Sequence, residues 1–388
     1  MDFLLSEDQH ALQDAVGRIA GRFDEAYWLA RDREGGFPVE FADAVAADGW
    51  LGIAMPEEHG GAGLGITEAA LMMQTVANGP GAFAAASSIH LNIFGLNPVV
   101  VFGTEGQRAR MLPPIIKGDH RACFGVTEPD AGLDTGSLKT KAVRDGGTYI
   151  VQGRKVWTTN AQSSTHILLL ARTTPQEDVT RSTDGLSLFY TALDRDYVTV
   201  REIDKMGRKA VDSNEVFIDE LPVPAIDRIG EEGEGFRYLL DGLNPERILV
   251  AAEAIGIARY AIGRAAKYAG ERIVFGRAIG QNQAIQHPLA ESWAELEAAD
   301  LLMLKAAQLY DAGKPCGAEA NAAKYIAAEV AYRACERALL THGGYGYAKE
   351  FVVERLLREV MIARIAPVSQ QLLLCYIAER VLGLPKSY

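Results

Sequence analysis

Apolar residues recur with a helical period in the first part of the chain, up to about residue 120. The pattern predicts helices over 6–19, 43–50, 67–77 and 106–112. The last of these is expected to stop at Pro113 and Pro114, because proline cannot continue a helix. Residues 79–92 are small and apolar, as in a tightly packed helix or a pocket wall. We therefore predict an N-terminal helical domain over residues 1–120.

The pattern changes at about residue 121, where short runs of β-branched and aromatic residues replace the helical period. Predicted strands cover 122–127, 148–151, 166–171, 186–193, 198–203 and 214–218. Glycine, aspartate and proline stand between these runs, as is typical of turns in an antiparallel sheet. We predict a middle antiparallel β domain, either a barrel or a sandwich, over residues 121–228.

The helical period returns at about residue 229 and continues to 388. Helices are predicted over 243–270, 284–312, 316–341 and 350–380, and their short connections favour a four-helix bundle. Asn244 is expected to cap the first of them, with Pro245 at the first helical position. The alternative is a start near Gly235 with a kink at Pro245. The predicted fold class is α+β, with an N-terminal helical domain, a middle antiparallel β domain and a C-terminal four-helix bundle.

Composition excludes several classes of function. The chain has 388 residues, 48% of them hydrophobic, and a formal net charge of −12, which argues against nucleic acid or an anionic membrane as partner. Its four cysteines contain no Cys-x-x-Cys pair, as expected for reduced thiols rather than disulfides or zinc ligands. The first ten residues lack a signal-peptide pattern, and no apolar run is expected to reach membrane-spanning length. We expect a cytoplasmic protein without a metal.

Glu246 stands at the head of the first bundle helix, where two interpretations are open. An acidic residue in a first turn is favoured by the helix dipole, and Glu246 can simply pair with Arg247. A carboxylate that faces an apolar pocket can instead act as a general base. Local rules do not decide between the structural and the catalytic role.

Three other segments carry candidate chemistry. The turn from Gly125 to Asp134 offers a Thr hydroxyl and free N–H groups to a polar ring edge or a diphosphate, or it is a plain β-turn. The segment from Arg154 to Asn160 places a Trp beside two Thr residues, which suits stacking on a planar cofactor or sealing of a β core. The glycines of residues 342–347 allow a ligand to approach the backbone closely, or they form a helix cap.

The order and spacing of these segments resemble the acyl-CoA dehydrogenase family. The runs VTEPDAGLD, KVWTTN, RIVFGRAIGQNQ, HGGYGY and ERLLREVMIARIAPVSQ follow one another as they do in that family, over essentially the whole chain. The resemblance implies helical, β and four-helix-bundle domains in that order, assembled as a homotetramer that is a dimer of dimers. It also implies FAD as the cofactor.

By that resemblance, cofactor contacts are expected in three places. The turn after the first strand and the KVWTTN run would hold the flavin and its diphosphate through Phe124, Val126, Thr127, Gly132, Leu133, Trp157 and Thr159. The bundle would reach the FAD of a neighbouring subunit through Arg272, Phe275, Gln283, Gly343 and Gly344. After the last loop, Ser369 and Gln371 would lie against the cofactor.

The implied reaction is α,β-dehydrogenation of an acyl-CoA thioester with a short, medium or branched acyl chain. A carboxylate removes the α-proton, the β-hydride passes to flavin N5, and an electron-transfer flavoprotein takes the electrons. Most relatives carry this base in the loop that is Ala366-Pro367-Val368 here, but a branch resembling isovaleryl-CoA dehydrogenase carries it in an acidic-x-Glu-Arg run at the helix head. The resemblance therefore assigns the base to Glu246, and substrate contacts to Leu133, Asn244, Arg247 and Pro367.

Pro367 departs from the family pattern, because the backbone N–H expected there to hold the thioester oxygen is absent in proline. Two alternatives therefore stay open: a flavin oxidase or monooxygenase on the same fold, and a flavin-binding protein with weak dehydrogenase activity. A substrate with a second carboxylate is less expected, since residues 79–88 contain no basic side chain.

Overall fold

The N-terminal residues fold into helices, as their apolar period predicts. The computed structural model describes residues 4–387, and its first helices are α1 (Glu7–Ala20), α2 (Glu25–Glu34), α3 (Val39–Ala47), α4 (Ile66–Ala77), α5 (Ala82–Phe94), α6 (Asn97–Phe102) and α7 (Glu105–Ile116). Helix α1 begins after Ser6 because the Ser6 hydroxyl accepts a hydrogen bond from the backbone N–H of Gln9 at 3.1 Å. Helix α2 was not predicted, since charged residues occupy half of its positions and obscure the apolar period.

Helix α7 shows that one prediction was wrong, because it does not stop at Pro113 and Pro114 but continues to Ile116. The two prolines leave the carbonyls of Ala109 and Arg110 without their usual helical donors. Both of these residues are exposed, so water can satisfy their carbonyls. A proline pair near an exposed helix end therefore does not end this helix.

The middle segment forms one sheet with the strand order β6-β7-β3-β2-β4-β5-β8, and β1 pairs with β4. The strands are β1 (Ala122–Gly125), β2 (Lys141–Asp145), β3 (Thr148–Thr159), β4 (His166–Arg172), β5 (Leu186–Ala192), β6 (Val198–Glu202), β7 (Ser213–Pro224) and β8 (Arg228–Ile229). Neighbouring strands are antiparallel, except that β1 and β2 run parallel to β4. The predicted antiparallel β domain is confirmed, with these two parallel contacts added.

Strands β2 and β3 differ in detail from the prediction. Strand β2 was missed because only Ala142 of its residues is buried, so no apolar alternation marks it. Strand β3 continues past the predicted end at Val151, and its pairing with β7 shifts register between Lys155 and Thr158. Such a bulge redirects the side chains within it, and Trp157 lies there with a φ of 60°.

The C-terminal part consists of three long helices followed by shorter segments. The helices are α8 (Gly235–Asp241), α9 (Leu243–Glu271), α10 (Gln283–Asp311), α11 (Gly317–His342), α12 (Val353–Val360), α13 (Ile362–Ile365) and α14 (Gln370–Tyr376), and the hairpin β9 (Ile273–Val274) and β10 (Arg277–Ala278) joins α9 to α10. The helix predicted over 350–380 is interrupted at Ala366, because the residue before a proline is disfavoured in helical conformation. Short segments therefore replace the fourth helix of the predicted bundle.

The start of α9 corrects a second prediction. Helix α9 begins at Leu243, directly after α8, so Asn244 does not cap it. The side chain of Asn244 instead accepts a hydrogen bond from Arg247 Nη1 at 3.0 Å. The alternative of an earlier start near Gly235 was closer, because α8 begins there and only Gly242 separates the two helices.

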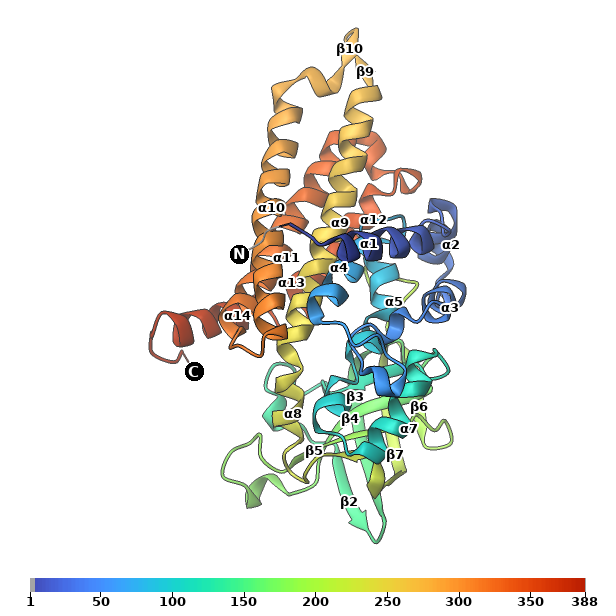
Figure 1. Cartoon of the computed structure of the whole chain (residues 1–388), viewed down its shortest axis with the longest axis vertical. Coiled ribbons are helices and arrows are strands. Elements are labelled where there is room, and N and C mark those ends of the chain that lie inside the picture. Colours follow the sequence, from blue (N-terminus) through green and yellow to red (C-terminus); the bar gives the residue numbers. More distant parts are fainter. Residues whose placement is uncertain (1–3, 388) are drawn as a thin grey trace.

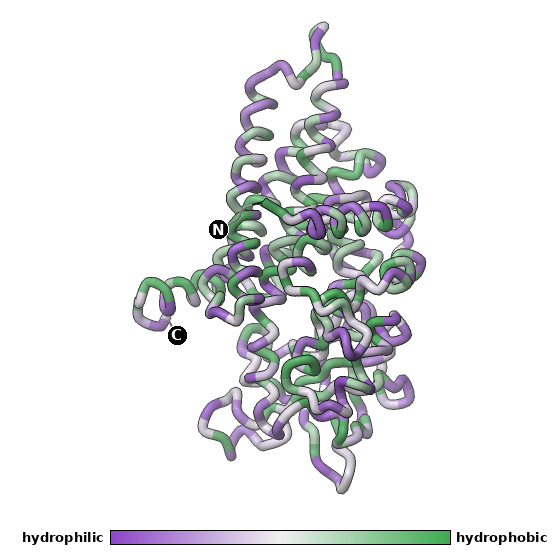
Figure 2. Tube along the Cα trace, in the orientation of Figure 1, coloured by the Kyte–Doolittle hydropathy of each residue, from purple (hydrophilic) through white to green (hydrophobic). Residues whose placement is uncertain are grey.

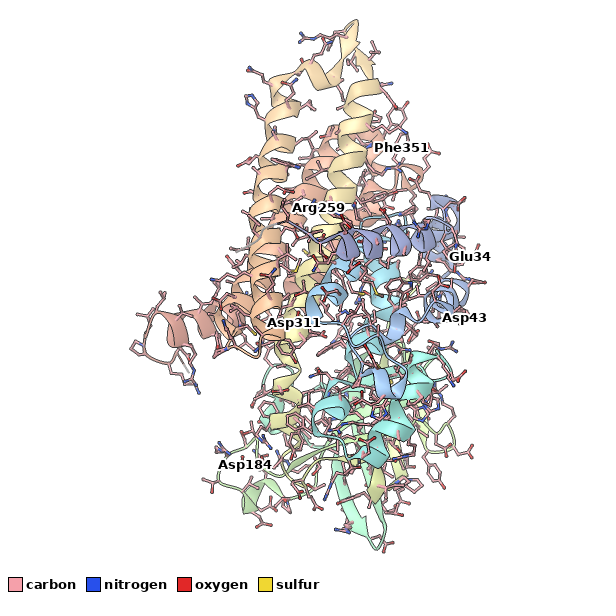
Figure 3. The ribbon with its side chains drawn as sticks, in the orientation of Figure 1. Glu34, Asp43, Asp184, Arg259, Asp311 and Phe351 are labelled. Atoms are coloured by element: carbon pink, nitrogen blue, oxygen red, sulfur yellow. The ribbon has the colours of Figure 1, made fainter. Side chains whose placement is uncertain are left out.

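The long helices α9 and α10 rise to the β9–β10 hairpin at one end of the molecule, and the sheet lies at the opposite end (Figure 1). Hydrophilic and hydrophobic residues alternate along α10 (Figure 2). Between the two ends, α4 and α5 share one buried core with the bundle, in which Met72 and Ile255 are both fully buried. Asp311 ties the same parts together, because its carboxylate accepts the N–H groups of Ile66 at 2.7 Å and Thr67 at 2.9 Å (Figure 3).

Two helical segments are long and apolar enough, by length and composition alone, to cross a membrane, so the expectation that no run reaches that length was wrong. In Ala82–Phe102, 72% of the apolar window is buried inside the protein, which identifies it as core. In Val353–Val381 only 17% is buried. That segment is broken at Ala366 and Pro367, so it does not form one straight helix.

Candidate functional site

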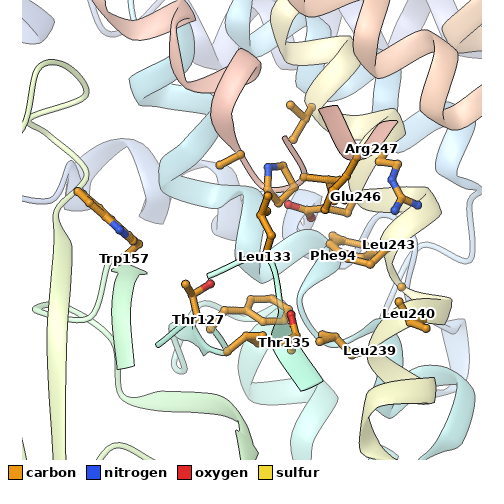
Figure 4. A pocket seen from close by; sticks show the side chains of 18 of the residues that line it. Phe94, Thr127, Leu133, Thr135, Trp157, Leu239, Leu240, Leu243, Glu246 and Arg247 are labelled. Carbon is orange, nitrogen blue, oxygen red and sulfur yellow. The ribbon is translucent and has the colours of Figure 1, made fainter. Parts of the chain in front are cut away.

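A cavity of about 590 Å³ lies where the sheet domain, α5, α8 and α9 meet (Figure 4). Many of the residues predicted as contacts line it, although they come from distant parts of the chain: Phe124, Val126, Thr127, Gly132, Leu133, Trp157, Thr159, Glu246, Arg247 and Pro367. The opposite wall, from α5 and α8, adds apolar side chains such as Phe83, Phe94 and Leu239. The cavity therefore joins a polar rim on the sheet domain to a largely apolar interior.

Of the contacts predicted within one chain, three do not line this cavity. Asn244 faces Arg247, as described above, and is absent from the walls. Ser369 caps α14, because its hydroxyl accepts the N–H of Leu372 at 3.5 Å, and Gln371 is exposed. Within one chain, these side chains have local roles or face outward.

The residues predicted to reach a neighbouring subunit lie at the far end of the bundle, away from the cavity (Figure 1). Phe275, in the β9–β10 hairpin, is fully exposed, and Gln283 at the start of α10 is exposed as well. The guanidinium of Arg272 stacks over the ring of Tyr345 at 5.4 Å, so the hairpin lies beside the loop of Gly343 and Gly344. A single chain gathers these residues on its surface but does not bring them to its own cavity.

Glu128, in the turn after β1, holds the polar rim of the cavity in place. Its carboxylate lies 2.9 Å from Lys155 Nζ and accepts the backbone N–H groups of Lys139 at 2.7 Å and Thr140 at 2.9 Å. Lys155 Nζ also donates to the carbonyl of Val126 at 3.2 Å. Burial opposes the charged carboxylate, but Lys155 and these N–H groups hold the pKa of Glu128 below its usual range. The motif turn is therefore fixed to β3 by a buried ion pair.

The rim fits a planar cofactor with polar edges, such as FAD. The bulge in β3 turns the indole of Trp157 outward, so that 58% of it is exposed beside the cavity. Among the described residues, no side chain or backbone group is hydrogen-bonded to the hydroxyls of Thr127 and Thr159, so both can bind a ligand. No cluster of His, Cys, Asp and Glu suited to a metal ion occurs in residues 4–387.

Glu246 is bound to a histidine rather than to Arg247, which corrects the structural interpretation of its role. His90 Nε2 lies 2.7 Å from Glu246 Oε2, and His90 Nδ1 lies 2.5 Å from Glu253 Oε1. All three side chains line the cavity, and Glu246 is the most accessible of them, at 13% exposed. Burial opposes a charged imidazole, but Glu246 and Glu253 hold the pKa of His90 well above its ordinary value.

His90 and Glu253 were not recognised in the sequence. His90 belongs to the apolar run 79–92, where it is the only ionisable side chain and could have been noticed. Glu253 follows Glu246 by seven positions, which places both on one face of α9. That spacing could have indicated a pair of carboxylates, but their shared partner His90 on α5 is evident only in the folded chain.

Lys324 of α11 holds the loop of Ala366, Pro367 and Val368, which the sequence resemblance singled out. Its Nζ donates to the carbonyl of Val368 at 2.7 Å, and burial, together with nearby Arg247, lowers the pKa of Lys324 to about 8. Pro367, next to Val368, faces the cavity and offers no N–H. This loop is thus fixed in place without a backbone donor at position 367.

Family models describe all three parts of the chain. Residues 6–119 match the acyl-CoA dehydrogenase N-terminal domain, 123–221 the middle domain and 233–382 the C-terminal domain. Acyl-CoA dehydrogenase FadE12 of Mycobacterium tuberculosis is 36% identical over 392 residues, which covers 100% of this chain and 99% of FadE12. The caffeyl-CoA reductase-Etf complex subunit CarC of Acetobacterium woodii is 35% identical, over 85% of this chain and 86% of CarC.

Solved structures show the same similarity. Butyryl-CoA dehydrogenase from Megasphaera elsdenii superimposes with a TM-score of 0.93 at 30% identity, over 98% of this chain and 100% of that one. The FAD complex of PigA superimposes with a TM-score of 0.92 at 26% identity, over 99% of this chain and 100% of PigA. The fold, the cavity and these matches together establish that the chain is an oxidoreductase of the acyl-CoA dehydrogenase family, whose members are flavoproteins.

Proposed function

We propose that this protein is an FAD-dependent acyl-CoA dehydrogenase that converts a short, medium or branched acyl-CoA thioester to the 2-enoyl-CoA. Glu246 carries the proposal, because it is a carboxylate on the wall of a largely apolar cavity with one oxygen bonded to His90. Its position at the helix head suits the role of α-proton base in a chain whose usual base position is Pro367.

The residues of the cavity would divide the work. The oxygen of Glu246 that is not bonded to His90 takes the α-proton, and the electron pair of the broken C–H bond spreads into the thioester carbonyl. The apolar walls of Phe83 and Phe94 exclude water around the reacting carbons. Arg247 and Leu133, which line the cavity, would flank the thioester. When bound, FAD supplies the oxidising power that removes the β-hydrogen with its electron pair.

The proposal extends to the cofactor and the partners. The exposed indole of Trp157 and the free hydroxyls of Thr127 and Thr159 suit the flavin ring and its polar edge. The FAD complex of PigA supports this choice of cofactor. The similarity to CarC, a subunit of a complex with Etf, supports an electron-transfer flavoprotein as acceptor. We further propose a cytoplasmic homotetramer in which the hairpin of α9 and α10 reaches a neighbouring FAD.

Anaerobic titration of the yellow protein tests the proposal. Butyryl-, octanoyl-, isovaleryl- and 3-phenylpropionyl-CoA are added in turn while flavin absorbance is recorded. In the wild type we expect bleaching by at least one thioester. In Glu246→Gln we expect the rate of bleaching to fall by about 10³-fold or more, because a positioned general base is removed. Asp300→Asn is the matched control, since Asp300 is a partly buried carboxylate bonded to Gln74 and Arg259. Full bleaching by Glu246→Gln would show that the base lies elsewhere.

A flavin oxidase is the second candidate, and Pro367 is the observation that favours it. The missing N–H removes one donor for the developing oxyanion, and such a donor is worth roughly 10²-fold or more in rate. Rapid reoxidation of the substrate-reduced flavin by air would support the oxidase. Slow reoxidation, together with rapid transfer to an electron-transfer flavoprotein, would support the dehydrogenase.

A further inference from the structure

We infer that His90 and Glu253 act through Glu246 as positioning residues, fixing its orientation and setting its proton affinity, so that the three side chains form one acid–base unit. The inference rests on the proposed function, because it takes Glu246 as the base. It adds one residue from α5 and one from the middle of α9 to the residues expected from the sequence motifs. Below, these three residues are called the Glu–His–Glu unit.

Hydrogen bonding at both ends of the imidazole is the first support. His90 Nε2 lies 2.7 Å from Glu246 and His90 Nδ1 lies 2.5 Å from Glu253. When both carboxylates are ionised they can only accept, so each ring nitrogen must donate and the ring carries two protons. The exposed fractions are 8% for His90 and 2% for Glu253, so water does not compete for these bonds. The geometry therefore fixes the protonation of the ring as well as its orientation.

The charge of the unit is the second support. An isolated pair of Glu246 and His90 would be neutral, and the adjacent cation would make the carboxylate a weak base. Glu253 adds a second negative charge on the other side of the ring, which gives the unit a net charge of −1. The imidazolium of His90 thus holds one oxygen of Glu246. The carboxylate of Glu253 offsets the loss of basicity that this cation would cause in Glu246.

Charged groups from the neighbouring elements surround the unit without replacing its bonds. Arg208, half-buried in the loop between β6 and β7, donates to Ser87 Oγ at 2.9 Å and attracts Glu253. Arg247 of α9 and Lys324 of α11 attract Glu246. On α12, Glu359 faces Arg355 at 4.0 Å and also attracts Arg208. Among the described residues, only Glu246 and Glu253 are hydrogen-bonded to the imidazole of His90.

The proton balance follows from this arrangement. The α C–H bond of the thioester breaks, its proton moves to the free oxygen of Glu246, and the electron pair stays on the substrate. The unit then has a net charge of zero, with His90 still bonded to both carboxylates. Release of that proton to water after the product leaves restores the starting state.

Exchange of the α-hydrogen with D₂O, followed by mass spectrometry over a range of pH, tests the inference in the FAD-loaded protein with the same four thioesters. In Glu253→Gln we expect a limiting exchange rate about tenfold lower and an acid midpoint about one pH unit lower, because the cation now faces Glu246 alone. In His90→Gln we expect the midpoint to move to higher pH, because two carboxylates face each other without a cation. A packing defect lowers the rate but does not move the two midpoints in opposite directions.

Two outcomes separate the inference from the proposed function. If exchange persists in Glu246→Gln, or if the wild type shows no exchange, the proposed function fails. If exchange needs Glu246 but neither midpoint moves, or both move the same way, the inference alone is wrong. Asp300→Asn serves again as the control carboxylate and should leave the midpoint unchanged.

The protonation of the His90 ring can be measured without substrate, so this test does not depend on activity. In ¹⁵N-histidine NMR of the wild type, the resonance lost in His90→Gln belongs to His90. We expect this ring to keep both N–H protons at pH 8 in the wild type and to lose one of them at lower pH in Glu253→Gln. A His90 ring with a single N–H at pH 8 in the wild type would overturn the inference whatever the activity.

Discussion

Glu128 shows how a motif residue can serve the site without lining it. The sequence placed Glu128 in a turn with ligand-binding potential, but its carboxylate is buried against Lys155 and two backbone N–H groups. These bonds fix the turn that presents Thr127 to the cavity. Within the motif, Glu128 thus has a structural role, because it orders the rim of the cavity.

Replacement of Glu128 should therefore affect stability more than chemistry. Because Glu128→Gln leaves Lys155 buried without a counter-charge, we expect a loss of about 3 kcal/mol in the free energy of unfolding, measured by urea denaturation at pH 7. The pKa of Glu128 is lowered in the folded state, so its contribution is present above the titration range of an unfolded glutamate and is lost as pH falls through the folded pKa. The difference between wild type and variant should shrink toward pH 3.

The double variant Glu128→Gln with Lys155→Met provides the control. It removes both charges, so it should recover part of the lost stability at pH 7. A loss of stability in Glu128→Gln that is the same at pH 7 and pH 3 would contradict the ion-pair interpretation.

The start of helix α4 depends on the carboxylate of Asp311, which is distant in the sequence. Gly65 precedes α4 and has no side chain to cap it, and Asp311 at the end of α10 accepts the N–H groups of Ile66 and Thr67 instead. The Thr67 hydroxyl also donates to Asp311 at 2.6 Å. The N-terminal helices and the bundle therefore share a helix cap as well as a core.

Loss of this cap should weaken both parts together. For Asp311→Ala we expect a loss of about 1–2 kcal/mol in the free energy of unfolding, as for other N-caps, together with faster amide exchange at the start of α4. Asp311→Asn keeps one acceptor oxygen and should lose less. Unchanged amide exchange at Ile66 and Thr67 in Asp311→Ala would show that the cap does not hold the helix.

The elements differ in how far the sequence could predict them. The domain order and the long helices of the bundle followed from apolar period, because burial repeats along each element. The break at Ala366, the bulge at Trp157 and the continuation of α7 depend on partners or solvent that the local pattern does not contain. The same holds at the site: Glu246 was found from its motif, whereas His90 and Glu253 needed the packing of α5 on α9.

At the scale of the whole molecule, the cavity and the tip of the bundle form two separate sets of predicted cofactor contacts. Thr127, Trp157 and Thr159 lie at the cavity, whereas Arg272 and Phe275 lie at the hairpin. Large exposed apolar residues also occur on the bundle, including Trp293 and Leu340, which is typical of a surface that another subunit covers. These observations support an assembly in which one chain completes the site of the next.

Sedimentation and flavin content together test that assembly. We expect the wild type to have four times the 42.0 kDa mass of one chain and to retain yellow colour after gel filtration. Arg272→Ala should keep the fold but lose FAD, by about tenfold or more in affinity, because one charge-assisted contact to the diphosphate is removed. Arg144→Ala is the matched control, since Arg144 is exposed on β2 and its side chain contacts only the β2–β3 hairpin among the described residues, through the Gly146 carbonyl at 3.3 Å and the ring of Tyr149 at 5.9 Å.

Flavin binding as a function of protein concentration tests whether a neighbouring subunit supplies Arg272. If a neighbouring subunit supplies Arg272, dilution that dissociates the wild type should release FAD at the same concentration, because the two equilibria are linked. Arg272→Ala should then bind FAD weakly even when fully assembled, which separates loss of the contact from loss of the assembly. A monomer that retains FAD, or an Arg272→Ala protein with unchanged flavin content, would show that each chain binds its cofactor alone and that the exposed hairpin serves another purpose.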